Sequence, residues 1–106
     1  MKYNHENKTS QAITVSAPLA VIDMTQYTSF AVQITVSDAL ALNSCVVKMQ
    51  ESVDGSNWFD IASVNSNITG NGSILLQSTS KCGQIRPYIT LVAGTLTATV
   101  KVNTKE

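Results

Sequence analysis

The sequence predicts an all-β protein: one antiparallel β-sandwich of about eight strands, with jelly-roll or immunoglobulin-like topology. Two observations predict this fold. Apolar and polar residues alternate along many segments, as in strands with one buried face. Turn-forming residues separate these segments at intervals of about 8–12 residues, and no window has a convincing helical period. The 106 residues suffice for one domain with one hydrophobic core.

The alternation defines the expected strands. In chain order they cover residues 13–15, 19–24, 30–37, 45–50, a return strand that carries Trp58, and residues 73–79, 85–92 and 95–102. In the last of these, apolar residues from Leu96 to Val102 alternate with three threonines and Lys101, which predicts one buried and one solvated face. Pro87 has no backbone N–H to donate, so we expect an edge, a bulge or a strand start there.

The connections between these strands carry turn and loop residues. Residues 54–57, Asp-Gly-Ser-Asn, and residues 93–94, Ala-Gly, predict hairpins. Residues 69–72 contain two glycines and predict a flexible loop. Residues 37–43 have two interpretations: one helical turn capped by Ser37 or Asp38, or a connecting loop.

The inward-facing positions of the strands are the expected core. They are Phe30, Val32, Ile34, Val47, Met49, Trp58, Ile61, Ile89, Leu91, Leu96, Ala98, Val100 and Val102. We expect the large ring of Trp58 to anchor this core; the alternative is that it serves as a platform for a ligand.

The charges and the termini complete the domain organisation. Residues 1–9 are expected to form a polar N-terminal arm, residues 10–103 the sandwich, and residues 104–106 a short C-terminal tail. Seven basic residues balance seven acidic ones, and only 13% of residues are charged. This balance argues against a protein that binds nucleic acid through a basic face, so we expect no nucleic-acid partner. A surface with few charges also resists association poorly, so we expect a homo-oligomer.

The N-terminus favours a cytoplasmic origin, and the expected state of the cysteines follows from it. The first residues are polar and resemble no secretory signal, and no apolar run approaches the roughly 20 residues of a membrane helix. We therefore expect a soluble protein made in a cytoplasm, without a membrane partner. Cys45 and Cys82 are expected to be reduced, and a disulfide between them remains the alternative.

The most specific stretch is residues 47–61, Val-Lys-Met-Gln-Glu-Ser-Val-Asp-Gly-Ser-Asn-Trp-Phe-Asp-Ile. It combines a strand with the pattern S-x-D-G-x-x-W-x-D-I, and residues 84–91 add a strand with I-R-P-Y-I. Over roughly residues 27–102, this pairing resembles small β-sandwich proteins of bacteriophage virions: decoration, vertex and tail proteins. It is also similar to discoidin-type and other carbohydrate-binding sandwiches, which share the hairpin pattern.

The hairpin holds the candidate interaction residues Asp54, Asn57, Trp58 and Asp60. They are expected to form a loop that contacts a ligand or a partner. The oxygen atoms of Asp54, Asn57 and Asp60 are also of the type that binds calcium, but a complete calcium-binding loop is absent from the sequence, so we expect no metal. Arg86 is expected to pair with Asp60 or with Glu51.

No pattern predicts catalysis or a cofactor. The single histidine, His5, lies in the polar arm and is badly placed to activate a serine or cysteine nucleophile. We therefore expect no enzymatic activity, and the resemblance implies a virion structural protein, which assembles on a capsid or tail with itself and with other virion proteins. The alternative is a carbohydrate-binding module with a glycan ligand. The resemblance carries both hypotheses, because a fold does not fix a function.

Overall fold

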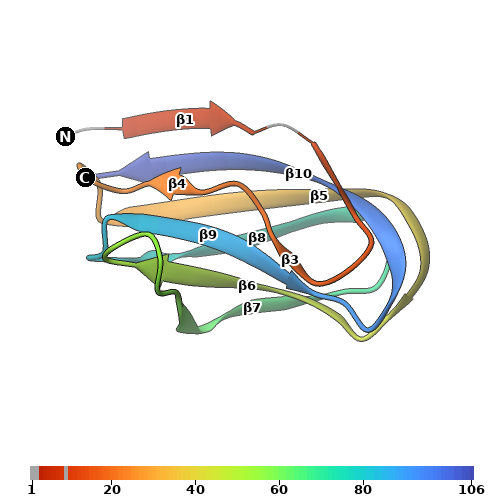
Figure 1. The fold of residues 1–106 in the computed structure, drawn as a ribbon. Helices are drawn as coiled ribbons and strands as arrows, with labels where there is room; N and C mark the ends of the chain where they lie inside the picture. Colours follow the sequence, from red (N-terminus) through yellow and green to blue (C-terminus); the bar gives the residue numbers. More distant parts are fainter. Residues whose placement is uncertain (1–2, 9) are drawn as a thin grey trace.

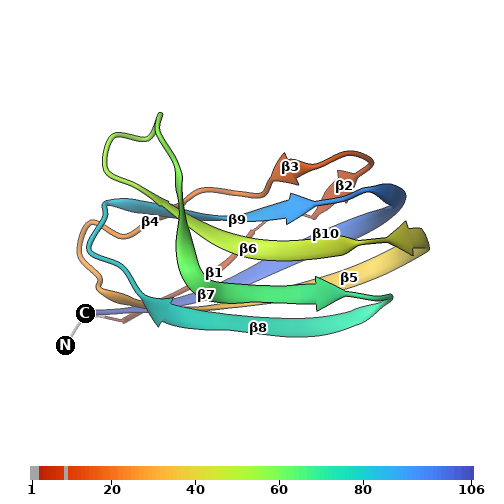
Figure 2. The ribbon, with the colours of Figure 1, turned by 90° about the horizontal axis from the view of Figure 1, so that it is seen from below.

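The computed structural model describes residues 3–8 and 10–106, and it has the predicted β-sandwich architecture (Figures 1 and 2). In the described part of the chain, no helix is long and apolar enough to span a membrane. The strands are β1 (Tyr3–Asn7), β2 (Gln11–Ile13), β3 (Ala17–Pro18), β4 (Ile22–Asp23), β5 (Ser29–Asn43), β6 (Cys45–Ser52), β7 (Phe59–Ile68), β8 (Gly72–Thr79), β9 (Gln84–Thr90) and β10 (Ala93–Lys105).

The strands form two antiparallel sheets that face each other. The first sheet has the order β1-β10-β5-β8, and β2 extends the β1 side of β10. The second sheet has the order β3-β9-β6-β7, and β4 pairs with β9 further along its length. Each sheet therefore has one edge made of two short segments and one edge made of a single longer strand, β8 in the first sheet and β7 in the second.

The core lies between the sheets, where apolar side chains alternate inward as predicted. The expected core residues are buried, with two exceptions. Ile61 is half-buried and packs against the core. Trp58 is also half-buried, but it lies outside the core, so the expectation that it anchors the core is wrong.

The N-terminal segment differs from the expected arm. Residues 3–7 form β1, which pairs with β10 from Tyr3 opposite Lys105 to Asn7 opposite Lys101. The sandwich therefore begins before Ser10, and the expected tail is also shortened, because β10 continues to Lys105. Positions 1, 2 and 9 of the expected arm lie outside the described residues.

Residues 37–43 form neither a helical turn nor a loop, because they continue β5 to Asn43. Seven residues of β5, 37–43, face five residues of β10, 93–97, so β5 holds two extra residues and its register shifts twice. Asp38 and Ala41, each with a φ of 54°, lie in these shifts. Such bulges bend a strand and break its alternation, which explains why the sequence pattern failed here.

The interruption expected at Pro87 is found on one side of β9. There β3 pairs with residues 88–89 and β4 with residues 84–85, so Pro87 lies in the gap between these two short strands. The Pro87 carbonyl oxygen still accepts a hydrogen bond of 2.8 Å from the Leu19 backbone N–H in this gap. Pro87, which has no N–H, therefore lies where the segment between β3 and β4 leaves the sheet.

Candidate functional site

The predicted β6–β7 hairpin carries the first part of the candidate site. The backbone N–H groups of Ser56 and Asn57 each donate a 2.8 Å hydrogen bond to Asp54 Oδ1, and the Asn57 side-chain amide donates to Asp54 Oδ2. The buried Ser52 hydroxyl accepts the Gly55 N–H at 2.8 Å. Gly55 has a φ of 80°, a conformation that glycine adopts at little cost. The four residues 54–57 therefore form a self-contained turn.

These donors determine the electrostatics of the turn. The backbone N–H groups of Asn57 and Ser56, followed by the Asn57 side chain, hold the pKa of Asp54 well below its usual range. Both carboxylate oxygens of Asp54 are thus already used by the loop. We assign Asp54 and Asn57 the role of shaping the turn.

Trp58 follows the turn and lies over Arg86 of β9. The Arg86 Cζ atom is 4.2 Å from the centroid of the Trp58 ring, the arrangement of a cation–π contact. The Arg86 Nε–H donates a 2.9 Å hydrogen bond to Gln50 Oε1. The expected direct pairing of Arg86 with Asp60 or Glu51 is therefore wrong, because Gln50 lies between Arg86 and Asp60.

Gln50 connects Arg86 to Asp60 across three strands. Gln50 pairs with Arg86 on one side and with Asp60 on the other. Its side-chain Nε2 donates to Asp60 Oδ1 at 3.1 Å, and Lys48 Nζ lies 3.1 Å from Asp60 Oδ2. The hydrogen bond from Gln50 and then that from Lys48 lower the pKa of Asp60. Asp60 is therefore an ionised and satisfied carboxylate.

Together these side chains form what we call the Arg86 face, on the outer surface of the second sheet. It consists of Lys48, Gln50, Trp58, Asp60, Arg86 and Tyr88. Of the four predicted site residues, the structure places Trp58 and Asp60 here, whereas Asp54 and Asn57 remain in the turn. Lys48, Gln50 and Tyr88 were not predicted as site residues. Their signal was available, since they occupy the polar positions of β6 and β9, the two strands whose sequence patterns carry the resemblance.

His5 and Cys45 lie away from the hairpin turn, whereas Cys82 lies beside Ser80 and Glu51. His5 Nδ1 lies 2.6 Å from Asn103 Oδ1 on the first sheet. Cys45 is buried and Cys82 half-buried, both are free thiols, and burial is the main cause that raises the pKa of each. Among the described residues, no three His, Cys, Asp or Glu side chains are grouped to hold a metal ion.

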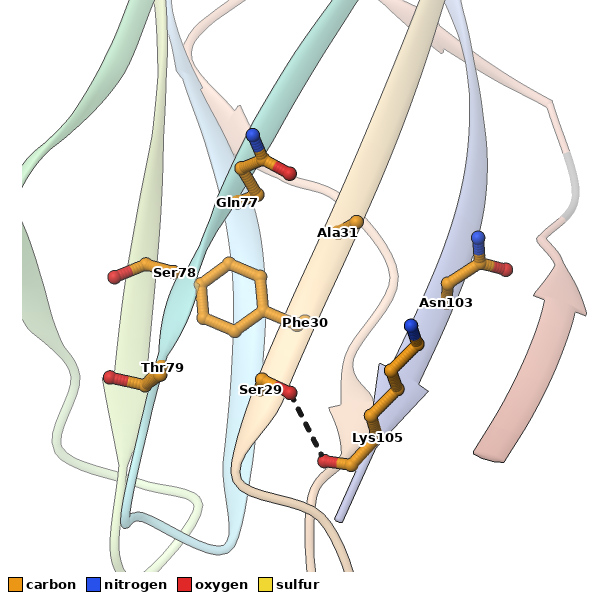
Figure 3. Close-up of a pocket in the computed structure, with 8 residues that line it drawn as sticks. All are labelled: Ser29, Phe30, Ala31, Gln77, Ser78, Thr79, Asn103 and Lys105. Atoms are coloured by element: carbon orange, nitrogen blue, oxygen red, sulfur yellow. Dashed lines mark hydrogen bonds between the residues drawn. The ribbon is translucent and has the colours of Figure 1, made fainter. Parts of the chain in front are cut away.

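A shallow groove of about 410 Å³ crosses the outer surface of the first sheet (Figure 3). Its floor contains the small residues Ser29 and Ala31 of β5, and Gln77 of β8 and Lys105 of β10 stand on either side. This groove is open, and its lining residues do not form a catalytic arrangement. Its significance is that it ends against β8, the strand at the margin of the sheet.

The β8 edge is the second candidate site. Ser80 N–H donates a 2.9 Å hydrogen bond to the Thr28 carbonyl oxygen, in register with the β5–β8 ladder. Because bonded and non-bonded pairs alternate in an antiparallel ladder, the even-numbered residues of β8 bond to β5. The backbone groups of the odd-numbered residues therefore point to the open edge. These residues are Ser73, Leu75, Gln77 and Thr79.

Comparisons with known proteins add no family assignment. The sequence matches no protein-family model and shows no significant similarity to a curated protein.

Proposed function

We propose that this protein is a non-enzymatic virion structural protein that assembles with copies of itself and with other virion proteins on a phage capsid or tail. The observation that carries the assembly role is the β8 edge. The virion assignment rests on the resemblance of the hairpin and of residues 84–91 to small phage β-sandwich proteins.

The other three edges of the sandwich have features that discourage pairing with another chain. β1 carries an ion pair between Glu6 and Lys8 at its end. β3 and β4 have only two residues each. β7 departs from its register with β6 near Ser63, which has a φ of 63°. Charges, short strands and bulges are the usual means by which proteins protect sheet edges.

β8 has none of these protective features. Its eight residues contain no charged side chain and no proline, and its register with β5 is continuous from Gly72 to Thr79. Leu75 is 57% exposed at the middle of the strand. Figure 2 shows β8 at the outer margin of the first sheet. A strand of this kind is an effective template for a further strand.

A second copy of the same chain fits this edge. Two β8 strands can pair antiparallel about a two-fold axis at Leu76, which places Ser73 opposite Thr79 and Leu75 opposite Gln77 of the other copy. This register uses the outward N–H and C=O groups of all four odd-numbered residues. It brings no like charges together, because the strand is uncharged. The product is a continuous sheet across both copies, an isologous interface.

The test is incorporation into particles. Virions are purified from the cells that produce this protein, and the chain is quantified in them by mass spectrometry. We expect wild-type protein in fixed copy number and strong depletion of Leu75→Lys, since a lysine protects an edge strand. Val92→Lys adds the same charge at a 69% exposed position outside β8 and is expected to incorporate normally. Absence of the wild-type chain from particles contradicts the virion assignment, and equal incorporation of Leu75→Lys contradicts the β8 contact.

A carbohydrate-binding module is the second candidate function. The two aromatic residues on the Arg86 face, Trp58 and Tyr88, favour it, because sugars stack on exposed rings. We place it second because Arg86 already covers one face of the Trp58 ring at 4.2 Å. To test it, the protein is titrated with neutral oligosaccharides, and binding is monitored by the fluorescence of Trp58, the single tryptophan of the sequence. A saturating change in fluorescence supports the module, and a flat response contradicts it.

A further inference from the structure

We propose that Arg86 is the anchor of a second contact surface, where its guanidinium binds the carboxylate of an acidic side chain from a protein partner. This surface is on the sheet opposite to β8. It rests on the proposed function only in taking the partner to be a protein.

The position of Arg86 is held from two directions. Its Nε–H donates to Gln50 Oε1 at 2.9 Å, and the flat guanidinium stacks 4.2 Å from the Trp58 ring centroid. Gln50 is itself fixed, since its amide nitrogen donates to Asp60. An arginine that is held by stacking and by its Nε loses little further freedom when it binds a ligand.

The terminal nitrogens of Arg86 are left for a partner. Of the guanidinium nitrogens of Arg86, Nε is the one that has a hydrogen-bond acceptor among the described residues. Asp60, the carboxylate of the Arg86 face, is already paired with Lys48 and Gln50. A structural role as support for the hairpin accounts for the Trp58 stack and for the Nε bond. It leaves the two terminal N–H groups without an acceptor among the described residues, and because they are not among the buried unpartnered atoms they are open to a ligand from solvent.

The local charge favours an anion. Lys48 and Arg86 supply two positive charges and Asp60 one negative charge, so the Arg86 face has a surplus of one positive charge. Both cations also flank the Tyr88 ring, with Lys48 Nζ at 5.6 Å and Arg86 Cζ at 5.7 Å from its centroid. A guanidinium fork matches a planar carboxylate through two parallel hydrogen bonds.

The shape of the surface favours a protein partner. Arg86 and Tyr88 project from a sheet face and Trp58 lies over Arg86, whereas the groove of about 410 Å³ lies on the other sheet. Trp, Tyr and Arg are the residue types that dominate binding energy at protein–protein interfaces. An acidic side chain seated on Arg86, with its neighbours on the two rings, fits this composition.

The test uses Trp58 as its reporter, because it is the only tryptophan of the chain and lies against Arg86. The probe is the peptide acetyl-Gly-Glu-Gly-Glu-Gly-amide, and the same peptide with Gln in place of Glu is the control ligand. We expect the Glu peptide to change the Trp58 fluorescence in a saturable, salt-sensitive manner and the Gln peptide to have no effect. Arg86→Gln is expected to weaken binding at least about tenfold. Arg86→Lys keeps the charge without the fork and is expected to bind more weakly than wild type.

Lys101→Gln is the matched control variant. It removes the same charge from an exposed position on the opposite sheet and is expected to bind like wild type. If Arg86→Gln does not fold, two-dimensional NMR of the wild-type protein replaces it, with the expected shifts confined to the Arg86 and Trp58 side-chain N–H signals.

Three results would overturn the proposal: equal binding of the Gln peptide, unchanged binding by Arg86→Gln or Arg86→Lys, and tighter binding of tetragalacturonate, an acidic saccharide, than of the Glu peptide. The particle assay with Leu75→Lys does not involve Arg86. Failure of this proposal is therefore distinguishable from failure of the proposed function.

Discussion

Gly94 lies directly against Ala41, where β10 runs beside the second bulge of β5. A Cβ atom on Gly94 would come within 2.5 Å of the Ala41 carbonyl oxygen, and the φ of Gly94 is +99°. Both the contact and the dihedral angle therefore require glycine at this position. The double bulge of β5 and the glycine of β10 form one structural unit.

The first prediction concerns this unit. Gly94→Ala is expected to destabilise the fold by about 2 kcal/mol or more, because it adds both a backbone clash and an unfavourable φ. Gly70→Ala is the control, since nothing lies within 4 Å of a Cβ there and its φ is ordinary. Thermal or denaturant unfolding measures both. Equal stability of the two variants would show that β10 does not approach β5 in this way.

The second prediction concerns the register of β10. Val100 is 2% exposed and faces the core, whereas Thr99 faces outward and contacts the Ser10 hydroxyl. Val100→Asp is expected to cost about 4 kcal/mol or more, because it buries an unpaired charge. Thr99→Asp is expected to change stability by about 1 kcal/mol at most. A shift of the register by one residue would exchange the two outcomes in a thermal melt.

The third prediction concerns β1. Removal of residues 1–8 deletes five cross-strand pairs with β10, from Tyr3–Lys105 to Asn7–Lys101. The cost is expected to be on the order of 2 kcal/mol, since β1 contributes mainly backbone hydrogen bonds and few apolar contacts. The truncated protein should still fold, and its β10 amides should exchange hydrogen faster. A melting temperature identical to that of the full chain would mean that β1 adds nothing to the fold.

The fourth prediction concerns acid. The pKa of Asp54 is lower in the folded protein than in the unfolded chain, so the stability it contributes is present above the ordinary aspartate pKa of about 4 and is lost as the pH falls below it. Asp54→Asn removes this contribution at neutral pH. The difference in melting temperature between wild type and Asp54→Asn is therefore expected to shrink from pH 6 to pH 3. A constant difference over that range would contradict the role of the Asp54 charge in the turn.

The elements that the sequence predicted well are those whose alternation is unbroken. From Phe30 to Val36 and from Leu96 to Val102, every second residue is buried, so the pattern alone located the strands and their inner faces. The Asp-Gly turn was also predictable, because its φ requirement is local. The bulged half of β5 was not, since its extra residues Asp38 and Ala41 destroy the period of two.

Other features depend on contacts between distant residues. β1 has no apolar alternation, and only its pairing with β10 makes it a strand. Trp58 has the size and hydrophobicity of a core residue, but Arg86, 28 positions later, holds it at the surface. The Gln50 link between Arg86 and Asp60 follows from the register of three strands. The sequence shows that Gln50 occupies a polar position of its strand, but the register that places it between Arg86 and Asp60 depends on pairing between distant segments.

The central claim is that β8 pairs with β8 of a second copy, and the mass of the purified protein in solution tests it most directly. Sedimentation equilibrium over a range of concentrations is expected to show wild type and Val92→Lys in a reversible equilibrium that reaches twice the 11.3 kDa chain mass. Leu75→Lys is expected to remain at the monomer mass, with an unchanged melting temperature at low concentration. A wild-type protein that stays monomeric at all concentrations, or a Leu75→Lys variant that associates like wild type, would contradict the account.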